Sequence, residues 1–65
     1  MKIVVNGEPA DIRAATLASL LDELGYGDAV VATALNGAVV RKARRDATPI
    51  ADGDRVEILA PMQGG

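Results

Sequence analysis

The sequence ends in Met62-Gln63-Gly64-Gly65, so a backbone carboxylate follows two residues without side chains. A terminal carboxylate has a pKa near 3.5 and is ionised at neutral pH, which makes it a poor electrophile. Attack on the α-phosphate of ATP would give an acyl-adenylate, and a sulfur donor could then displace AMP to leave a thiocarboxylate. Glycine suits this chemistry, because a residue without a Cβ can enter a narrow channel and does not crowd the reacting carbon.

A chance origin of the two glycines is the alternative, since roughly one chain in 200 would end this way at average composition. In that case the segment is a frayed end without function. The chain has no His, Cys or Trp, and its nine carboxylates are scattered rather than paired. General acid–base and covalent catalysis depend mostly on the missing residue types. We therefore predict that the protein is not an enzyme and has no catalytic residue, metal site or bound cofactor.

Length and composition set the broad class. A chain of 65 residues makes a single domain. No apolar run approaches the roughly 18 residues that span a bilayer, and the N-terminus does not resemble a signal peptide. The net charge of −2 argues against bulk nucleic-acid binding. We expect a cytoplasmic protein that is monomeric when free and does not bind membranes or nucleic acid.

Two Asn-Gly pairs predict two β-hairpins, because both residue types accept the positive φ of a tight turn. Asn6-Gly7 separates strands at residues 2–6 and 9–13, and Pro9 restricts the second of these to an edge of the sheet. Asn36-Gly37 separates strands at residues 30–35 and 38–42. A polar connection is expected after the second hairpin.

A helix is predicted between the hairpins. Thr16 suits its N-cap and Gly25 the position after its end, and four leucines spaced i, i+3, i+4 and i+7 form one apolar stripe. These are Leu17, Leu20, Leu21 and Leu24. Asp22 and Glu23 fall on the polar face and are interpreted as solvated surface.

The last strand, at residues 55–60, alternates so that Val56 and Ile58 should point inward. One helix must cover one face of the sheet, and the simplest arrangement sets this strand beside and parallel to the first. The predicted fold is therefore α+β, of the β-grasp or ubiquitin-like type, with a mixed four- to five-stranded sheet. Residues 1–60 would form the domain, and residues 61–65 a flexible, reactive tail.

Two surface features suggest contacts with partners. Val4, Ala34 and Leu59 are predicted to face away from the helix and to form a docking surface. The single basic cluster has three readings: a solvated loop, which composition favours, a nucleic-acid contact, or a contact with an acidic partner. It comprises Arg41, Lys42, Arg44 and Arg45.

Over its whole length the sequence resembles the ThiS family, the sulfur carrier proteins of thiamine biosynthesis. The resemblance lies in the segments "VNGEP", "TLASLLDELG", "VATALNG", "ADGDRVEIL" and "MQGG". The chain departs from the family pattern after "VV", where it has Arg41 instead of the frequent Pro, and it lacks the Trp that often follows.

The resemblance implies that Gly65 is adenylated by a ThiF-like adenylyltransferase that consumes ATP. A persulfide donor then converts Gly65 to a thiocarboxylate, whose sulfur thiazole synthase uses. Gly64, Gln63 and Met62 would be recognised by these partners. Two alternatives stay open: a carrier for molybdopterin or tRNA thiolation, and a non-covalent β-grasp binding module whose glycines are incidental. Conjugation to protein lysines, as in ubiquitin, is a further possibility.

Overall fold

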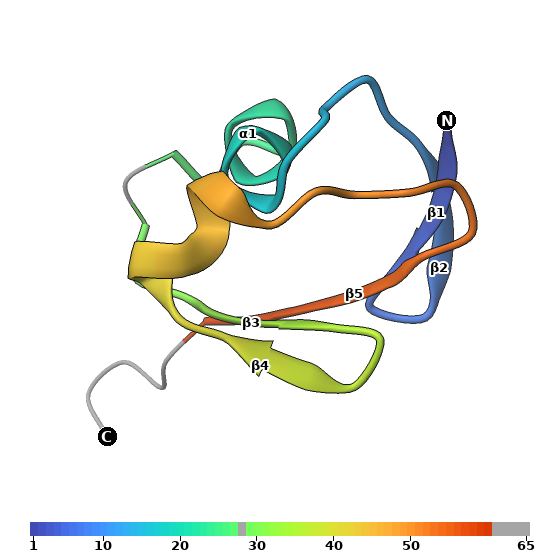
Figure 1. Cartoon of the computed structure of the whole chain (residues 1–65). Helices are drawn as coiled ribbons and strands as arrows, with labels where there is room; N and C mark the ends of the chain where they lie inside the picture. The colour runs from blue at the N-terminus through green and yellow to red at the C-terminus, as the bar shows by residue number, and fades with distance from the viewer. Residues whose placement is uncertain (28, 61–65) are drawn as a thin grey trace.

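The computed structural model describes residues 1–27 and 29–60, which form a five-stranded sheet with one α-helix across it (Figure 1). The helix α1 is Leu17–Glu23, and a short 3₁₀-helix, η1, is Lys42–Ala47. The strands are β1 Lys2–Val5, β2 Glu8–Asp11, β3 Ala32–Leu35, β4 Ala38–Val40 and β5 Arg55–Leu59.

The strands are ordered β2-β1-β5-β3-β4, so the last strand in sequence is central in space. β5 runs parallel to β1 and antiparallel to β3, and the two hairpins flank this pair. This is the β-grasp arrangement that the sequence predicts. β2, which contains Pro9, is an edge strand as expected, since proline cannot donate a hydrogen bond to a further strand.

The helix begins and ends where the sequence predicts. The Thr16 hydroxyl accepts a hydrogen bond from the Ser19 N–H at 3.2 Å, and the Ser19 hydroxyl accepts one from the Thr16 N–H at 3.1 Å. This reciprocal pair satisfies two N–H groups that the first turn leaves free. Gly25 follows the C-cap with φ +90°, a conformation that favours glycine.

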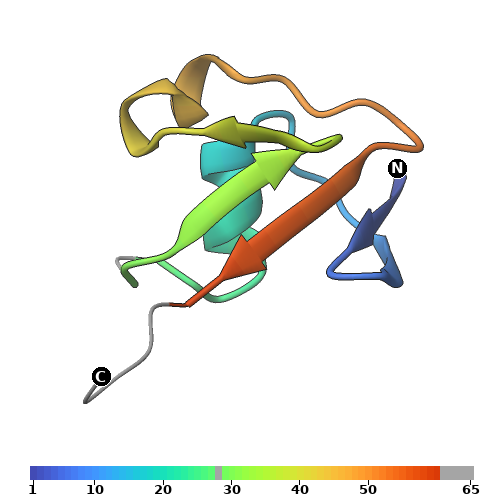
Figure 2. The ribbon, with the colours of Figure 1, turned by 90° about the horizontal axis from the view of Figure 1, so that it is seen from below.

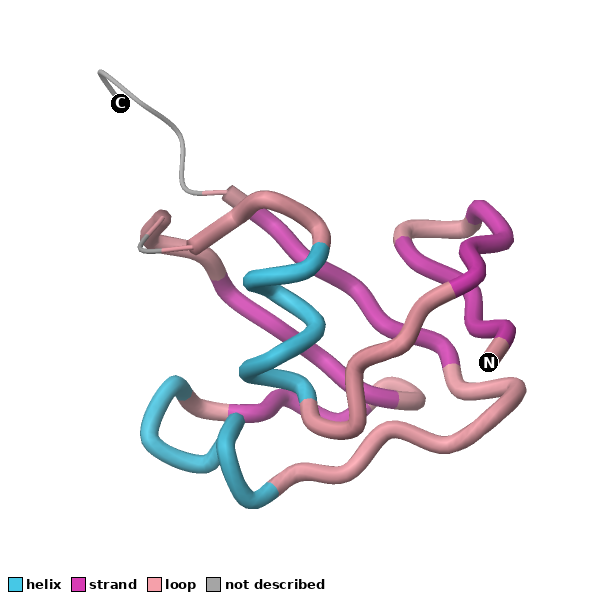
Figure 3. Tube along the Cα trace, turned by 90° about the horizontal axis from the view of Figure 1, so that it is seen from above, coloured by secondary structure: helices cyan, strands magenta, loops and turns pink. Residues whose placement is uncertain are grey.

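The core lies between α1 and the sheet, and Figure 3 shows α1 crossing above the strands. Leu17 and Leu20 are completely buried and belong to the same apolar cluster as the inward side chains of the central strand. Val56 and Ile58 are buried and their neighbours on β5 are exposed, which confirms the predicted alternation. The buried apolar side chains are Ile3, Ile12, Ala14, Leu17, Leu20, Leu21, Ile50, Val56 and Ile58.

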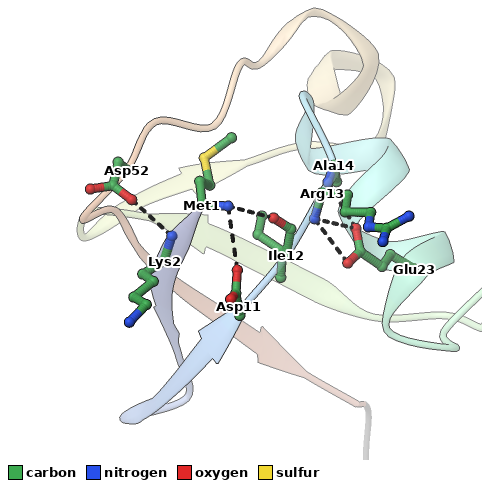
Figure 4. Close-up of polar contacts among 8 residues, drawn as sticks. All are labelled: Met1, Lys2, Asp11, Ile12, Arg13, Ala14, Glu23 and Asp52. Atoms are coloured by element: carbon green, nitrogen blue, oxygen red, sulfur yellow. Dashed lines mark hydrogen bonds and ion pairs between the residues drawn. The ribbon is translucent and has the colours of Figure 1, made fainter.

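Glu23 has a structural role that the sequence analysis missed. Its carboxylate accepts hydrogen bonds from the Arg13 N–H, at 3.0 Å to each oxygen, and from the Ala14 N–H at 2.8 Å (Figure 4). Glu23 and Asp22 are both exposed, as predicted for the polar face of the helix, but Glu23 also binds backbone donors, a role that the sequence did not indicate. Because the carboxylate satisfies two backbone donors at once, it fixes the approach of the chain to the helix.

The first strand is held in a similar way at its beginning. The α-amino group of Met1 donates to the Ile12 carbonyl at 2.7 Å, and the Lys2 N–H donates to the Asp52 carboxylate at 2.8 Å (Figure 4). These bonds tie β1 to the segments that precede α1 and β5.

The connection between β4 and β5 is more ordered than predicted. It contains η1, where the Thr48 hydroxyl donates to the Arg44 carbonyl at 2.6 Å and closes the last turn. Its sequence lacks an apolar period, so pattern analysis could not find this helix. Each strand is also shorter than predicted, by one residue or more.

Candidate functional site

The described chain leads to the proposed reactive segment through residues 58–60, which we call the tail root. Ile58 is buried on β5, while Leu59 and Ala60 are exposed at the end of the strand. The four residues predicted to carry the chemistry lie outside the described residues, and their roles stay predictions. These residues are Met62, Gln63, Gly64 and Gly65.

Asn6 holds the tail root in place. β1 ends at Val5, so no strand residue of β1 lies opposite Ile58. The Asn6 side chain fills this position, because its amide donates to the Ile58 carbonyl at 3.0 Å and its oxygen accepts from the Ile58 N–H at 2.8 Å. A side-chain amide thus replaces a backbone peptide group and extends the pairing of β1 with β5 to the tail root.

Asn36 has the equivalent position at the other end of β5. Its side-chain oxygen accepts from the Arg55 N–H at 2.9 Å, and its amide donates to the Asp54 carboxylate at 3.0 Å. The Ala51 N–H, with this amide, holds the pKa of Asp54 below its ordinary value. Both asparagines have φ +50°, so the two turns place matching side chains at opposite ends of β5.

The sequence predicts both asparagines as turn residues but not as contacts to β5. A signal was present, because Asp-Gly or Gly-Gly makes the same turn without an amide that can both donate and accept. Two hairpins that both use Asn are the pattern that could have indicated the second role.

We predict that Asn6→Gly exposes the tail root without disrupting the fold. Glycine tolerates the positive φ, so the substitution removes the side-chain bonds and keeps the turn. The expected cost is about 2 kcal/mol for two partly buried hydrogen bonds. Amide hydrogen exchange should accelerate at Ile58.

Asn36→Gly is the matched control, because it removes the same side chain from a turn with the same φ. Exchange at Ile58 should stay slow in this variant, and exchange at Arg55 should accelerate instead. Equal protection of Ile58 in both variants would show that Asn6 does not hold the tail root.

The outer face of the sheet, opposite α1, carries the three residues of the predicted docking surface. Leu59 is 66% exposed, and Val4 and Ala34 are half-buried. Val39 of β4, which lies opposite Ala34, is 81% exposed and extends the apolar area. No described element covers this face (Figure 2). The placement agrees with the sequence analysis, and the docking role stays a prediction.

A shallow apolar hollow adjoins the tail root. It is formed by the end of β5 and by the residues at the beginning of β3. Its lining residues are Val30, Val31, Ala32, Leu59 and Ala60. The end of β5 therefore borders an apolar surface on the side of β3.

The basic cluster divides into two parts. Arg45 is only 8% exposed, and its guanidinium donates to the Thr33 hydroxyl at 3.1 Å and the Val31 carbonyl at 2.6 Å. The reading of the whole cluster as a solvated loop is therefore wrong for Arg45, which fastens η1 to β3. Arg41, Lys42 and Arg44 are exposed.

Residues 1–27 and 29–60 contain no group of three or more His, Cys, Asp or Glu side chains that could hold a metal ion. None of their helices is long and apolar enough to cross a membrane. The predicted cytoplasmic location stays a prediction.

The topology and the central β5 define a β-grasp protein. The model of the ThiS family matches residues 3–65, so the chain belongs to the ThiS family. It is 39% identical to the sulfur carrier protein ThiS of Thermus thermophilus over 94% of this chain and 95% of that protein. The family resemblance predicted from the sequence is thus confirmed, and it places the chain among sulfur carriers rather than catalysts.

Solved structures agree with this assignment. The crystal structure of the thiamine biosynthesis protein ThiS from Geobacter metallireducens superimposes with a TM-score of 0.84, at 39% identity, over the full length of both chains. The solution structure of a thiamine biosynthesis protein from Geobacter metallireducens gives a TM-score of 0.81, at 38% identity, over all of this chain and 88% of that one.

Another relative is much longer. The chain is 39% identical, over its full length, to a thiazole synthase of Paramagnetospirillum magneticum, and it spans only 20% of that protein. A segment similar to this entire chain therefore occurs within a polypeptide named for a different activity.

Proposed function

We propose that the protein carries sulfur as a thiocarboxylate on Gly65 and delivers it for formation of the thiazole ring of thiamine. The observation that carries this proposal is the central strand β5, which ends two residues before "MQGG" in a chain of the ThiS family. Residues 60–65 reach about 20 Å when extended, far enough to enter a partner's active site while the domain stays outside.

In the proposed reaction a carboxylate oxygen of Gly65 attacks the α-phosphate of ATP, and pyrophosphate leaves. The terminal sulfur of a cysteine persulfide then attacks the acyl carbon of the adenylate, and AMP leaves. A thiol cleaves the resulting sulfur–sulfur bond, which releases the thiocarboxylate while the thiol is oxidised to a disulfide. The enzymes supply the catalytic groups, and this chain supplies the acyl group.

The proposed partners are a ThiF-like adenylyltransferase, a persulfide donor and thiazole synthase. The longer relative supports the last of these, because it joins a segment similar to this chain to a protein named thiazole synthase. Covalent linkage raises the effective concentration of two parts that act on each other. In the proposed reaction the same sulfur transfer takes place between two separate proteins, this chain and a thiazole synthase.

The acceptor can be tested with the thiocarboxylated chain. We expect it to lose its sulfur when mixed with thiazole synthase and that enzyme's small-molecule substrates, with a thiazole product formed in equal amount. The same carrier should keep its sulfur with a molybdopterin synthase large subunit and precursor, or with a tRNA-thiolating enzyme and tRNA. Transfer only in one of the last two mixtures would replace the thiamine assignment with that acceptor.

A further inference from the structure

The charges of this chain are unevenly distributed. Residues 41–45 contain four of its seven Lys and Arg residues and no carboxylate, a charge of +4. The other 60 residues contain three cationic and nine acidic side chains, a charge of −6. A protein with a net charge of −2 thus has one compact cationic area, which can orient it toward a charged partner.

Three of these four cations face solvent, and we call Arg41, Lys42 and Arg44 the η1 patch. Within residues 1–27 and 29–60, none of the three lies within 4.0 Å of a carboxylate. Arg45 fastens their helix to β3 through two hydrogen bonds, so η1 is held against the sheet. The η1 patch is therefore a fixed group of exposed charges, and internal ion pairs of the described chain do not account for it.

The register of the sheet brings the η1 patch to the same end of the molecule as the tail root. Val40, the last residue of β4, lies opposite Thr33, and Thr33 lies opposite Ile58. Adjacent strands are about 4.8 Å apart, and two such spacings separate β4 from β5. The backbone of Arg41 therefore lies about 10 Å from the tail root. Figure 1 shows η1 and the end of β5 at one end of the sheet. A protein that receives the tail at this end would extend readily over the η1 patch.

We propose that the η1 patch is a docking surface for an acidic area on the adenylyltransferase that activates Gly65. This inference rests on the proposed function and adds to it the part of the carrier that the enzyme recognises. Charge complementarity identifies the partner surface as acidic. The surface beside the patch indicates a protein partner, because the shallow hollow lined by Val39, Val40, Arg41, Arg44 and Thr48 combines valine side chains with two guanidinium groups.

A nucleic-acid partner fits this surface less well. Single-stranded nucleic acids bind through bases stacked on aromatic side chains, and the one aromatic residue of the chain is Tyr26, outside the η1 patch. Exposed Val39 offers a nonpolar contact that a protein surface can match. The remaining surface, with its excess of carboxylates, would repel phosphates.

The test compares two double variants with the same net charge. Arg41→Glu/Arg44→Glu reverses the η1 patch, and Lys2→Glu/Arg13→Glu reverses two exposed cations elsewhere. Pyrophosphate release by the adenylyltransferase with ATP is measured against carrier concentration at low and high salt. We expect the first variant to raise KM about tenfold at low salt with kcat unchanged, and the effect to shrink at high salt. The control should leave KM within about twofold.

Several outcomes would overturn the inference: an unchanged KM in Arg41→Glu/Arg44→Glu, an equal rise in both variants, or a loss in kcat alone. Binding of bulk tRNA that the patch reversal abolishes, with KM for adenylation unchanged, would assign the patch to nucleic acid. Arg41→Gln/Arg44→Gln, which removes charge without reversing it, should show a smaller rise and repeats the test if the reversed variant unfolds. A wild-type chain that is never adenylated would contradict the proposed function, and this inference with it.

Discussion

Deletion of Gly65 is expected to abolish sulfur loading completely while the domain keeps its fold. The deletion moves the terminal carboxylate back by one residue, about 3.5 Å, so it no longer reaches the α-phosphate of ATP bound to the adenylyltransferase. Small displacements of reacting atoms already cost about 10²-fold in rate. The measurement is carrier-dependent release of pyrophosphate, followed by detection of the thiocarboxylate.

Gly65→Ala is the graded companion to the deletion. It keeps the length of the chain and the carboxylate but adds a Cβ beside the reacting carbon, and we expect adenylation to fall by about 10²-fold. Thermal unfolding of both variants should match that of the wild type, because the last residue of the buried core is Ile58 and Gly65 is not part of it. Undiminished loading of the deletion variant would show that Gly65 is not the modified residue. A wild type that is never loaded under the same conditions would favour a binding module with incidental glycines.

Leu20→Ala is expected to cost about 3–5 kcal/mol of stability, since Leu20 is 0% exposed at the centre of the core. A domain of this size has a free energy of unfolding of roughly 3–10 kcal/mol in total. The variant should therefore be partly or fully unfolded at 37 °C. Urea unfolding followed by circular dichroism measures the loss.

Val30→Ala provides the control, because Val30 is 77% exposed and its truncation should change stability by less than about 0.5 kcal/mol. Similar losses in the two variants would contradict the assignment of the core. Sulfur loading should decline in Leu20→Ala only in proportion to the unfolded fraction, since Leu20 contacts no reacting group in this account.

Local sequence patterns were sufficient to predict most of the fold. An Asn-Gly pair between two apolar runs strongly favours a tight hairpin turn. The leucine stripe between Thr16 and Gly25 gives the helix a single apolar face, which must pack on the sheet. Once one helix and two hairpins are placed, the alternation of Val56 and Ile58 requires a half-buried strand, and the central position beside β1 buries it best.

The features that were missed depend on contacts between residues distant in sequence. Arg45 is buried because Thr33 and the Val31 carbonyl lie beneath η1, and no local pattern in a run of basic residues indicates such partners. Glu23 binds the Arg13 and Ala14 N–H groups ten and nine residues earlier, and Asn6 binds Ile58 across 52 positions. Polar residues of this kind have a structural role that only tertiary structure reveals.

The candidate site was predicted from composition and position rather than from a pocket. "MQGG" ends in a carboxylate that can be activated, and the chain has no His or Cys. We therefore expect partner enzymes to supply the catalytic groups. What sequence could not supply is the setting of that segment. In the structure Asn6 fixes the tail root, an apolar hollow adjoins it, and the η1 patch lies at the same end of the sheet, two strands away from β5.

Conversion of Gly65 to a thiocarboxylate changes the intact mass of the chain, which mass spectrometry can measure. The purified protein is incubated with adenylyltransferase, ATP and a persulfide donor, beside the Gly65 deletion as control. We predict a mass increase equal to the replacement of one oxygen by sulfur, located on the C-terminal peptide and absent from the control. An unchanged mass, in a mixture that loads another ThiS protein, would contradict it.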